Sequence, residues 1–495
     1  MDYLIGIDVG TSGTKTALFD TKGNTVMKVT VEYPLYTPKE GWAEQKPEDW
    51  YNAVIQGLRI ISKEYPDANI LAIGLTGQMH GLVMLDDEGE VLRDSIIWCD
   101  QRTEKECGEI TKRVKNLVEI TANPAITGFT ASKILWVRNN EYEIYKKCRH
   151  ILLPKDYIRY KLTGAFATDV SDASGMQLLD IKRRSWSKEV LDDLDIDINL
   201  LPQCFESVEI TGYLTESAAR LCGLKSGIPV VAGGGDNAAS AIGTGVCEDG
   251  KAFTTIGTSG VVFVHTKEMK VDSLGRVHTF CAAVPGEYHV MGVTQGAGLS
   301  LKWFRDNFCQ EIMETSKLLN MDPYQLMDEK AGKVPIGSRG LYYLPYLMGE
   351  RTPHLDPNVK GAFLGITARN TKEDFIRAVM EGVSFSLKDC LKVFGQMGIF
   401  ADNMTLCGGG SKSALWAQMI SDVFNLPIST LDKNEGAAFG AAILAGTGAG
   451  VYESVKAAAK VIKQSGKFYP NEENVKVYEK LYGKYTTLYE KIKDI

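Results

Sequence analysis

Ile7-Asp8-Val9-Gly10-Thr11-Ser12-Gly13-Thr14 has a second copy near the middle of the chain, Thr255-Ile256-Gly257-Thr258-Ser259-Gly260. In both, a β-branched strand enters a Gly-Thr-Ser-Gly turn and leaves into another apolar strand, which is typical of a hairpin. Such a turn directs N–H and hydroxyl donors at one point, and its glycines let a phosphate chain approach. One copy alone would more often be an ordinary hairpin. Two distant copies indicate two related lobes that face one nucleotide.

Length and composition limit the class of protein. The 495 residues are too many for one hydrophobic core and predict two domains, expected at 1–244 and 252–446. The formal net charge of −7 argues against nucleic acid as a partner, because no lysine and arginine cluster could neutralise a run of phosphates. Neither a signal peptide nor a membrane span is predicted, and ten scattered cysteines indicate reduced thiols, so a cytoplasmic location is expected.

Local patterns predict a mixed sheet with helices in each lobe. Residues 3–33 alternate strand and turn as an antiparallel meander, and 70–76 is a strand of the buried type. The longest helix is expected to begin at Thr371, where Thr-Lys-Glu-Asp forms a capping box ahead of an apolar stripe. Residues 447–495 are expected to form a helical extension packed on the second lobe.

The usual nucleotide-binding signatures are absent, since the sequence contains no P-loop and no dinucleotide fingerprint after a strand. Instead, Gly408-Gly409-Gly410-Ser411 lies between a strand and a helix expected over 411–424, where adenine could lie against backbone without Cβ atoms. A glycine-rich connection with Ser411 as helix N-cap is the alternative interpretation. Together with the paired hairpins, the segment favours an ATP site that includes, from the first hairpin, Thr11, Ser12, Thr14 and Lys15.

Two aspartates are candidates for phosphoryl-transfer chemistry. Asp236 follows an apolar strand and three glycines, where its carboxylate could accept the proton of a substrate hydroxyl and orient the nucleophile. Capping of a helix that begins at Ala238 is the alternative role, and the two are compatible. Asp8 ends a buried strand beside the first glycine turn and is a candidate ligand for Mg²⁺. A structural aspartate in a turn is the alternative for Asp8.

A second group of polar residues predicts the site of the phosphate acceptor. Gln78-Met79-His80 lies between two glycines after one strand, and Asp100 and Arg102 follow the next. Polyols and sugars require many hydrogen-bonding groups and an apolar or aromatic wall, which these residues and Trp42 could supply. A single histidine in a loop is more often structural, but the flanking glycines favour close approach of a ligand. A small sugar or polyol is therefore the expected partner.

Three segments are similar to signatures of one known family. Residues 128–137 (Gly-Phe-Thr-Ala-Ser-Lys-Ile-Leu-Trp-Val), 361–366 running on to Glu381, and 41–45 (Gly-Trp-Ala-Glu-Gln) resemble the FGGY carbohydrate kinases. The likeness covers almost the whole chain. It implies an α/β fold of two actin-like, ribonuclease-H-like lobes with the nucleotide and the sugar in a cleft between them, and it implies ATP and Mg²⁺ as cofactors.

The same resemblance implies roles for individual residues. Gln-Met-His-Gly at 78–81 is similar to the members that phosphorylate D-xylulose, whereas glycerol kinases carry Arg-Glu at the matching place. It implies that Met79 and His80 contact the sugar and that Asn237 adds a contact. Asp236 is implied to be the proton acceptor. The implied ATP site includes Gly257, Thr258, Gly409 and Gly410.

The implied activity is transfer of a phosphoryl group from ATP on the second lobe to D-xylulose on the first, with lobe closure expelling water. Another sugar or polyol kinase of the family, of ribulose, gluconate or glycerol type, is the alternative, followed by an actin-like or chaperone-type ATPase. Gln101, where many relatives have glycine, keeps the neighbouring sugar contacts open. Two interpretations remain for the loop 345–354, namely part of the active cleft or a subunit contact in a homodimer.

Overall fold

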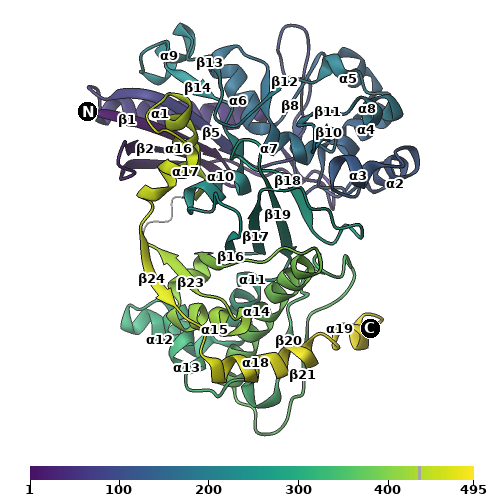
Figure 1. The fold of residues 1–495 in the computed structure, drawn as a ribbon, viewed down its shortest axis with the longest axis vertical. Helices are drawn as coiled ribbons and strands as arrows, with labels where there is room; N and C mark the ends of the chain where they lie inside the picture. The colour runs from purple at the N-terminus through teal and green to yellow at the C-terminus, as the bar shows by residue number, and fades with distance from the viewer. Residues whose placement is uncertain (433–435) are drawn as a thin grey trace.

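The computed structural model describes residues 1–432 and 436–495, which form two lobes, each built on one mixed sheet covered by helices (Figure 1). In the first lobe, β1 pairs antiparallel with β2 and parallel with β5. The strand order of this sheet is β13 (Ile210–Tyr213), β14 (Pro229–Val231), β5 (Asn69–Gly77), β1 (Asp2–Val9), β2 (Gly13–Asp20) and β3 (Thr25–Glu32), with the short β15 (Gly234–Gly235) beside β5.

The second lobe repeats this arrangement. Its β16 pairs antiparallel with β17 and parallel with β22, as β1 pairs with β2 and β5. The duplicated hairpin of the sequence therefore corresponds to a duplicated sheet, and the predicted two-lobed α/β fold is confirmed. The strand order is β18 (His278–Cys281), β19 (Tyr288–Thr294), β17 (Gly260–Thr266), β16 (Lys251–Ile256), β22 (Asn403–Gly408), β23 (Ile428–Leu431) and β24 (Gln464–Phe468).

Helices cover both faces of the first sheet because its central strands are apolar on both sides. Helix α1 (Pro47–Glu64) packs against β2 and β3, and α16 (Gly436–Gly448) packs against β1 and β5. A Cβ at Gly6 or at Gly74 would come within 1.9 Å of a carbonyl oxygen of α16, so only glycine permits this approach. The first sheet is thus completed by a helix from the far end of the chain.

Two helices join the lobes. Helix α10 (Asp236–Gly243) ends the first lobe, and α16 returns to it after the second sheet. They touch at backbone distance, since a Cβ at Gly440 would lie 1.8 Å from the carbonyl oxygen of Ala239. The edge strand β18 adds a further contact, because the amide of Cys281 donates to Ser174 Oγ at 3.1 Å. Helix α10 therefore lies where the lobes meet.

The other elements surround these two sheets. Helix α14 has the capping box predicted at Thr371. The first lobe also contains β4 (Glu44–Gln45), β6 (Val83–Leu85), β7 (Ser95–Ile96), α2 (Glu104–Arg113), α3 (Leu117–Thr121), α4 (Thr130–Asn140), α5 (Tyr142–Lys147), β8 (His150–Leu152), α6 (Pro154–Thr163), β9 (Ala167–Asp169), α7 (Val170–Ala173), β10 (Leu179–Asp180), β11 (Ser185–Trp186), α8 (Lys188–Leu194), β12 (Gln203–Phe205) and α9 (Glu216–Cys222). The second lobe contains α11 (Gly298–Phe308), α12 (Gln310–Leu319), α13 (Pro323–Ala331), β20 (Tyr342–Leu344), β21 (Ala362–Leu364), α14 (Lys372–Gln396) and α15 (Ala414–Phe424), and α17 (Val455–Ala458), α18 (Glu472–Tyr485) and α19 (Tyr489–Ile492) follow α16.

The expectation of a purely helical segment over 447–495 is wrong in one part. Residues Gln464–Phe468 form β24, which pairs antiparallel with β23 at the edge of the second sheet. Their polar side chains and glycine have little strand propensity, so pairing with the exposed edge of β23 decides the conformation. Helix α18 then packs on α15. None of the helices in the described part of the chain has the length and apolarity that a membrane crossing requires.

Candidate active site

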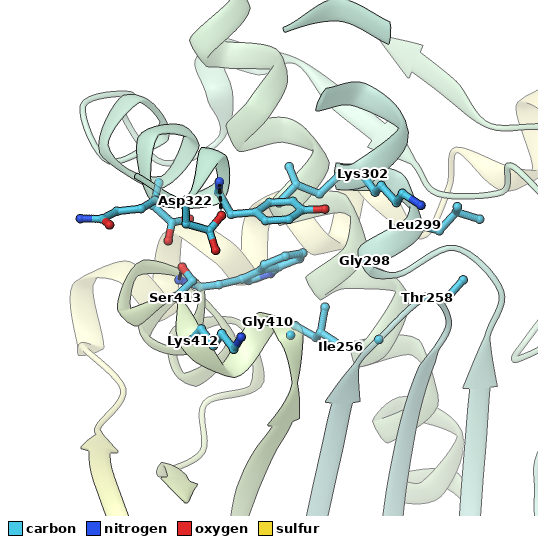
Figure 2. Close-up of a pocket in the computed structure, with 16 residues that line it drawn as sticks. Ile256, Thr258, Gly298, Leu299, Lys302, Asp322, Gly410, Lys412 and Ser413 are labelled. Atoms are coloured by element: carbon cyan, nitrogen blue, oxygen red, sulfur yellow. Dashed lines mark hydrogen bonds between the residues drawn. The ribbon is translucent and has the colours of Figure 1, made fainter. Parts of the chain in front are cut away.

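A cavity of about 570 Å³ opens in the second lobe above the ends of β16 and β22 (Figure 2). Gly408 has a left-handed φ of 78°, which turns the chain sharply after β22. A Cβ at Gly409 would meet only the carbonyl oxygen of Ile256, at 3.8 Å, so bare backbone faces the cavity there. The cavity is lined by Ile256, Gly257, Thr258, Gly298, Leu299, Leu301, Lys302, Asp322, Tyr324, Gln325, Asp328, Gly409, Gly410, Lys412, Ser413 and Trp416.

The structure brings four of the predicted ATP-site residues together here, namely Gly257, Thr258, Gly409 and Gly410. Ser411 is absent from the lining and donates its hydroxyl to the carbonyl oxygen of Gly408 at 2.8 Å. The alternative interpretation, in which Ser411 caps the next helix, is wrong, because Ser413 is the N-cap of α15 and accepts from the amide of Trp416 at 3.0 Å. A 3₁₀ turn over Gly409–Lys412 shifts the helix start by three residues.

Sequence patterns did not reveal the opposite wall of this cavity. It comes from α11 and α13, which contribute Leu299, Lys302, Tyr324, Gln325 and Asp328. These residues form no motif, and only the packing of α13 beside α14 brings them over the glycine turn. The cavity combines apolar walls with a few polar groups, as small-molecule sites generally do.

The first hairpin lies outside this cavity and is hydrogen-bonded to the turn that carries Gln78 and His80. Thr11 Oγ1 accepts from Trp98 Nε1 at 2.9 Å and donates to Gln78 Oε1 at 3.3 Å. Gln78 Nε2 in turn donates to Gln45 Oε1 at 2.7 Å. Thr14 is buried, whereas Ser12 is exposed at the turn. Thr11 and Gln78 thus connect the first Gly-Thr-Ser-Gly turn with the turn that carries His80.

Asp236 is the first residue of α10 and follows Gly235 directly. Its Oδ1 accepts from the amide and from Nδ2 of Asn237, at 2.6 and 2.9 Å. Burial, together with the charge of Asp8, raises the pKa of Asp236 to about 7. Burial also raises the pKa of Asp8 to about 6, opposed by the charge of Lys15. The arrangement therefore provides a carboxylate that can accept a proton near neutral pH.

The same two carboxylates suit a divalent cation. Mg²⁺ is usually held by one or two carboxylates together with substrate phosphates, and it needs no larger protein cage. Asp8 and Asp236 are such a pair, since the charge of Asp8 raises the pKa of Asp236 and a cation would relieve that repulsion. Within residues 1–432 and 436–495, no cluster of three or more acidic, histidine or cysteine side chains forms a complete metal cage. The donor set fits a cation shared with a nucleotide.

His80 has one ring nitrogen that can accept a hydrogen bond from a ligand. Its backbone φ is 70°, and its Nδ1 lies 3.0 Å from the carbonyl oxygen of Gly175. A carbonyl can only accept, so Nδ1 carries the proton and Nε2 keeps its lone pair. Burial, followed by the charge of Lys133, holds the pKa of His80 well below its ordinary value, so the ring is neutral. Lys133 Nζ donates to the carbonyl oxygen of His80 at 2.8 Å and fixes this turn.

Met79 connects this turn to Asp236. It is buried, and a Cβ at Gly235 would lie only 2.8 Å from its sulfur. The thioether therefore packs beneath the glycine pair that immediately precedes Asp236. Glycine at 235 is required for this contact, and Met79 in turn supports the backbone of the candidate base.

Asp100, Arg102 and Trp42 are already engaged with one another. Arg102 donates to both oxygens of Asp100, with Nη2 at 2.7 Å, and its Nη1 lies 2.7 Å from Glu44. The guanidinium carbon lies 3.6 Å from the centre of a Trp42 ring. Asp100 also accepts from the amide of Ala43 at 2.6 Å. These residues, predicted as sugar contacts, hold the wall of the cleft together through internal pairs.

Replacing His80 by asparagine is expected to raise the KM for the sugar about 10-fold, with a smaller change in kcat. Asparagine tolerates the left-handed backbone and can still donate to Gly175, but it has no acceptor at the place of Nε2. Initial rates against sugar concentration measure the effect. His150→Asn, in β8 with its ring against Phe166, is the matched control. An unchanged KM in His80→Asn would show that Nε2 does not contact the acceptor.

Comparison with known proteins identifies the family of the chain. Models of the N-terminal and C-terminal domains of the FGGY family of carbohydrate kinases match residues 3–243 and 252–449. The chain is 39% identical over 499 residues to a xylulose kinase of Bacillus subtilis (strain 168), covering 100% of this chain and 98% of that protein. A xylulose kinase of Escherichia coli (strain K12) is 38% identical over 442 residues, 89% of each chain.

Solved structures agree over nearly the full length. The structure titled as a xyloylose kinase from Brucella ovis superimposes with a TM-score of 0.91 at 35% identity over 99% of each chain. A gluconate kinase from Lactobacillus acidophilus reaches a TM-score of 0.92 at 28% identity over 99% of this chain and 98% of that one. With two family models covering both lobes, the chain belongs to the FGGY family of carbohydrate kinases and is a phosphotransferase.

Proposed function

We propose that the protein transfers the terminal phosphoryl group of ATP to D-xylulose, giving D-xylulose 5-phosphate, with Asp236 as the general base. The observation that carries the proposal is the adjacency of the Met79–His80 turn to Gly235 and Asp236, which joins an acceptor-binding turn to a carboxylate of raised pKa. The xylulose kinases among the relatives support the choice of sugar.

The reaction follows from what each group can do. Asp236 accepts the proton of the terminal hydroxyl of the sugar as its oxygen attacks the γ-phosphorus, and the bond from phosphorus to the bridging oxygen of ADP breaks. Asn237 holds Asp236 Oδ1 by two hydrogen bonds and so orients the carboxylate. A Mg²⁺ ion held by Asp8 and the nucleotide phosphates would neutralise the charge that develops on the transferred group. The backbone segments at Gly257 and Gly409, which line the cavity, are proposed to face the nucleotide.

A coupled ADP-release assay with ATP and Mg²⁺ tests the acceptor. D-xylulose is expected to give the highest kcat/KM among D-xylulose, L-ribulose, D-ribulose, glycerol and gluconate, with little ADP release when no sugar is present. Preference for another acceptor would contradict the choice of sugar but keep the role of Asp236. Fast ATP turnover without any sugar would contradict sugar phosphorylation altogether. Homodimer formation and a cytoplasmic location stay predictions.

A further inference from the structure

The loop 346–356 is fixed to the second lobe on β19. The amide of Thr352 donates to the carbonyl oxygen of Val293 at 3.0 Å, and the amide of Val293 donates back to Thr352 Oγ1 at 3.2 Å. Thr352 Oγ1 also donates to the carbonyl oxygen of Arg276 at 2.7 Å. The residue that precedes Thr352 therefore has its backbone held in place, and a side chain on such a rigid segment can position a ligand closely.

Glu350, the acidic neighbour in this loop, is engaged elsewhere. Its Oε1 accepts from the amides of Gln295 at 3.0 Å and of Arg351 at 2.8 Å, and its Oε2 accepts from Ser386 Oγ at 3.1 Å. It is almost fully buried, and burial raises its pKa to about 8. Glu350 thus anchors the loop and makes no ion pair with the guanidinium of Arg351.

The side chain of Arg351 reaches across to the first lobe. One guanidinium nitrogen lies 3.6 Å from the place that a Cβ of Gly128 would occupy. Its charge lowers the pKa of His80 and also that of His278. Of the hydrogen bonds and ion pairs found in the described part of the chain, none involves this guanidinium. Burial lowers the pKa of Arg351, opposed by the charge of Glu350, and the side chain keeps part of its surface exposed to solvent.

A half-buried guanidinium whose N–H groups are not used within the protein can donate them to a ligand. The position of Arg351 indicates which part of the ligand its guanidinium contacts. Lys133 Nζ donates to the carbonyl oxygens of both His80 and Gly128, at 2.8 and 2.6 Å, so the Arg351 guanidinium beside Gly128 lies on the His80 side. Arg351 therefore faces the part of the acceptor remote from the hydroxyl that receives the phosphoryl group.

The two polar groups at this remote end are complementary. The guanidinium has five N–H donors and no acceptor, whereas Nε2 of neutral His80 can only accept. A carbonyl oxygen, which only accepts, suits Arg351, and an adjacent hydroxyl, which donates, suits His80. A ketose presents this pair at C2 and C1.

We propose that Arg351 is a specificity-determining residue that donates hydrogen bonds to the C2 carbonyl of the sugar and thereby selects a ketose over the corresponding polyol. This inference rests on the proposed phosphorylation of D-xylulose and deepens it. It also assigns the part of the loop 345–354 that carries Arg351 to the active cleft, one of the two interpretations that the sequence left open.

The test compares D-xylulose with xylitol, which differs only by reduction of the C2 carbonyl. In Arg351→Met, the KM for D-xylulose is expected to rise about 10- to 100-fold, with the KM for ATP unchanged. The affinity for xylitol, measured as a substrate or a competitive inhibitor, should fall far less, so the ketose-to-polyol ratio shrinks. Arg351→Lys should restore part of that ratio, because it keeps a donor and the charge.

The ratio is measured on one preparation, so partial unfolding of a variant does not alter it. Arg220→Met is the matched control, since Arg220 is exposed and its guanidinium lies 3.8 Å from Glu216. An Arg351→Met protein that loses D-xylulose and xylitol affinity equally, or neither, would overturn the proposal. A wild-type enzyme that does not prefer D-xylulose would instead overturn the proposed function, which the acceptor assay detects before any variant is made.

Discussion

Asp236→Asn is expected to lower kcat for sugar phosphorylation about 10³-fold while leaving ATP binding intact. Asparagine has nearly the same shape and can keep an oxygen toward the amide of Asn237, but it cannot accept the proton of the sugar hydroxyl. The proposed nucleotide cavity is lined entirely by residues of the second lobe, so the substitution at Asp236 does not alter its lining. Initial rates with saturating sugar measure kcat, and calorimetric titration with a non-hydrolysable ATP analogue measures nucleotide affinity.

Asp389→Asn is the matched control for this substitution. Asp389, on helix α14, is also buried, and burial also raises its pKa to about 7. It accepts a hydrogen bond from Tyr482 Oη at 2.6 Å. It lies in neither proposed site, so its removal should leave kcat within a small factor of the wild type. A kcat for Asp236→Asn within 10-fold of the wild-type value would show that Asp236 is not the general base.

The pH profile gives a second signature of the same group. A base acts only when ionised, and the pKa of Asp236 is about 7, so wild-type kcat/KM for the sugar should rise with pH and level off above neutrality. Asp236→Asn should lack this limb. Folding stability changes with pH in the opposite direction, because the carboxyl of Asp236 binds its proton more tightly in the folded state than in the unfolded state. Folding stability from this group therefore falls as pH rises from about 4 to 7, and the asparagine variant should melt no lower than wild type.

Gly409→Leu is expected to raise the KM for ATP about 100-fold or more, with the KM for the sugar little changed. A Cβ at Gly409 meets only the carbonyl oxygen of Ile256 at 3.8 Å, so the backbone accepts a side chain, which then fills the cavity. The loss should therefore be one of nucleotide binding at an unchanged melting temperature. Steady-state kinetics at varied ATP and a thermal melt measure the two effects.

Two other glycines separate cavity filling from misfolding. A Cβ at Gly483, in α18, has no neighbour within 4 Å, so Gly483→Leu should leave the KM for ATP unchanged. A Cβ at Gly410 would come within 2.6 Å of Ile256, so Gly410→Ala should lower the melting temperature instead. A normal KM for ATP in Gly409→Leu would show that the nucleotide does not occupy this cavity.

Much of the fold and part of the site follow from short-range patterns. The Gly-Thr-Ser-Gly hairpins predicted two related lobes, and the capping box at Thr371 predicted the start of α14, because a turn and a helix cap depend on residues a few positions apart. The sequence also identified Asp236, Met79 and His80 as candidates. The structure places them side by side, through the contact of Met79 with Gly235.

Long-range packing decided the rest. Only the fold brings α13 over the glycine turn of the nucleotide cavity, pairs Arg102 with Asp100, makes a strand of Gln464–Phe468 and returns α16 to the first sheet. Arg351 belongs to this group, because its sequence neighbours predict a loop and only the fold brings its guanidinium beside Gly128 of the first lobe. The sequence by itself determined most of the elements, since these depend on local spacing, and it indicated the reaction class through its resemblance to one family. Which distant side chains share a cavity depends on contacts across hundreds of residues, and the tertiary structure alone decided it.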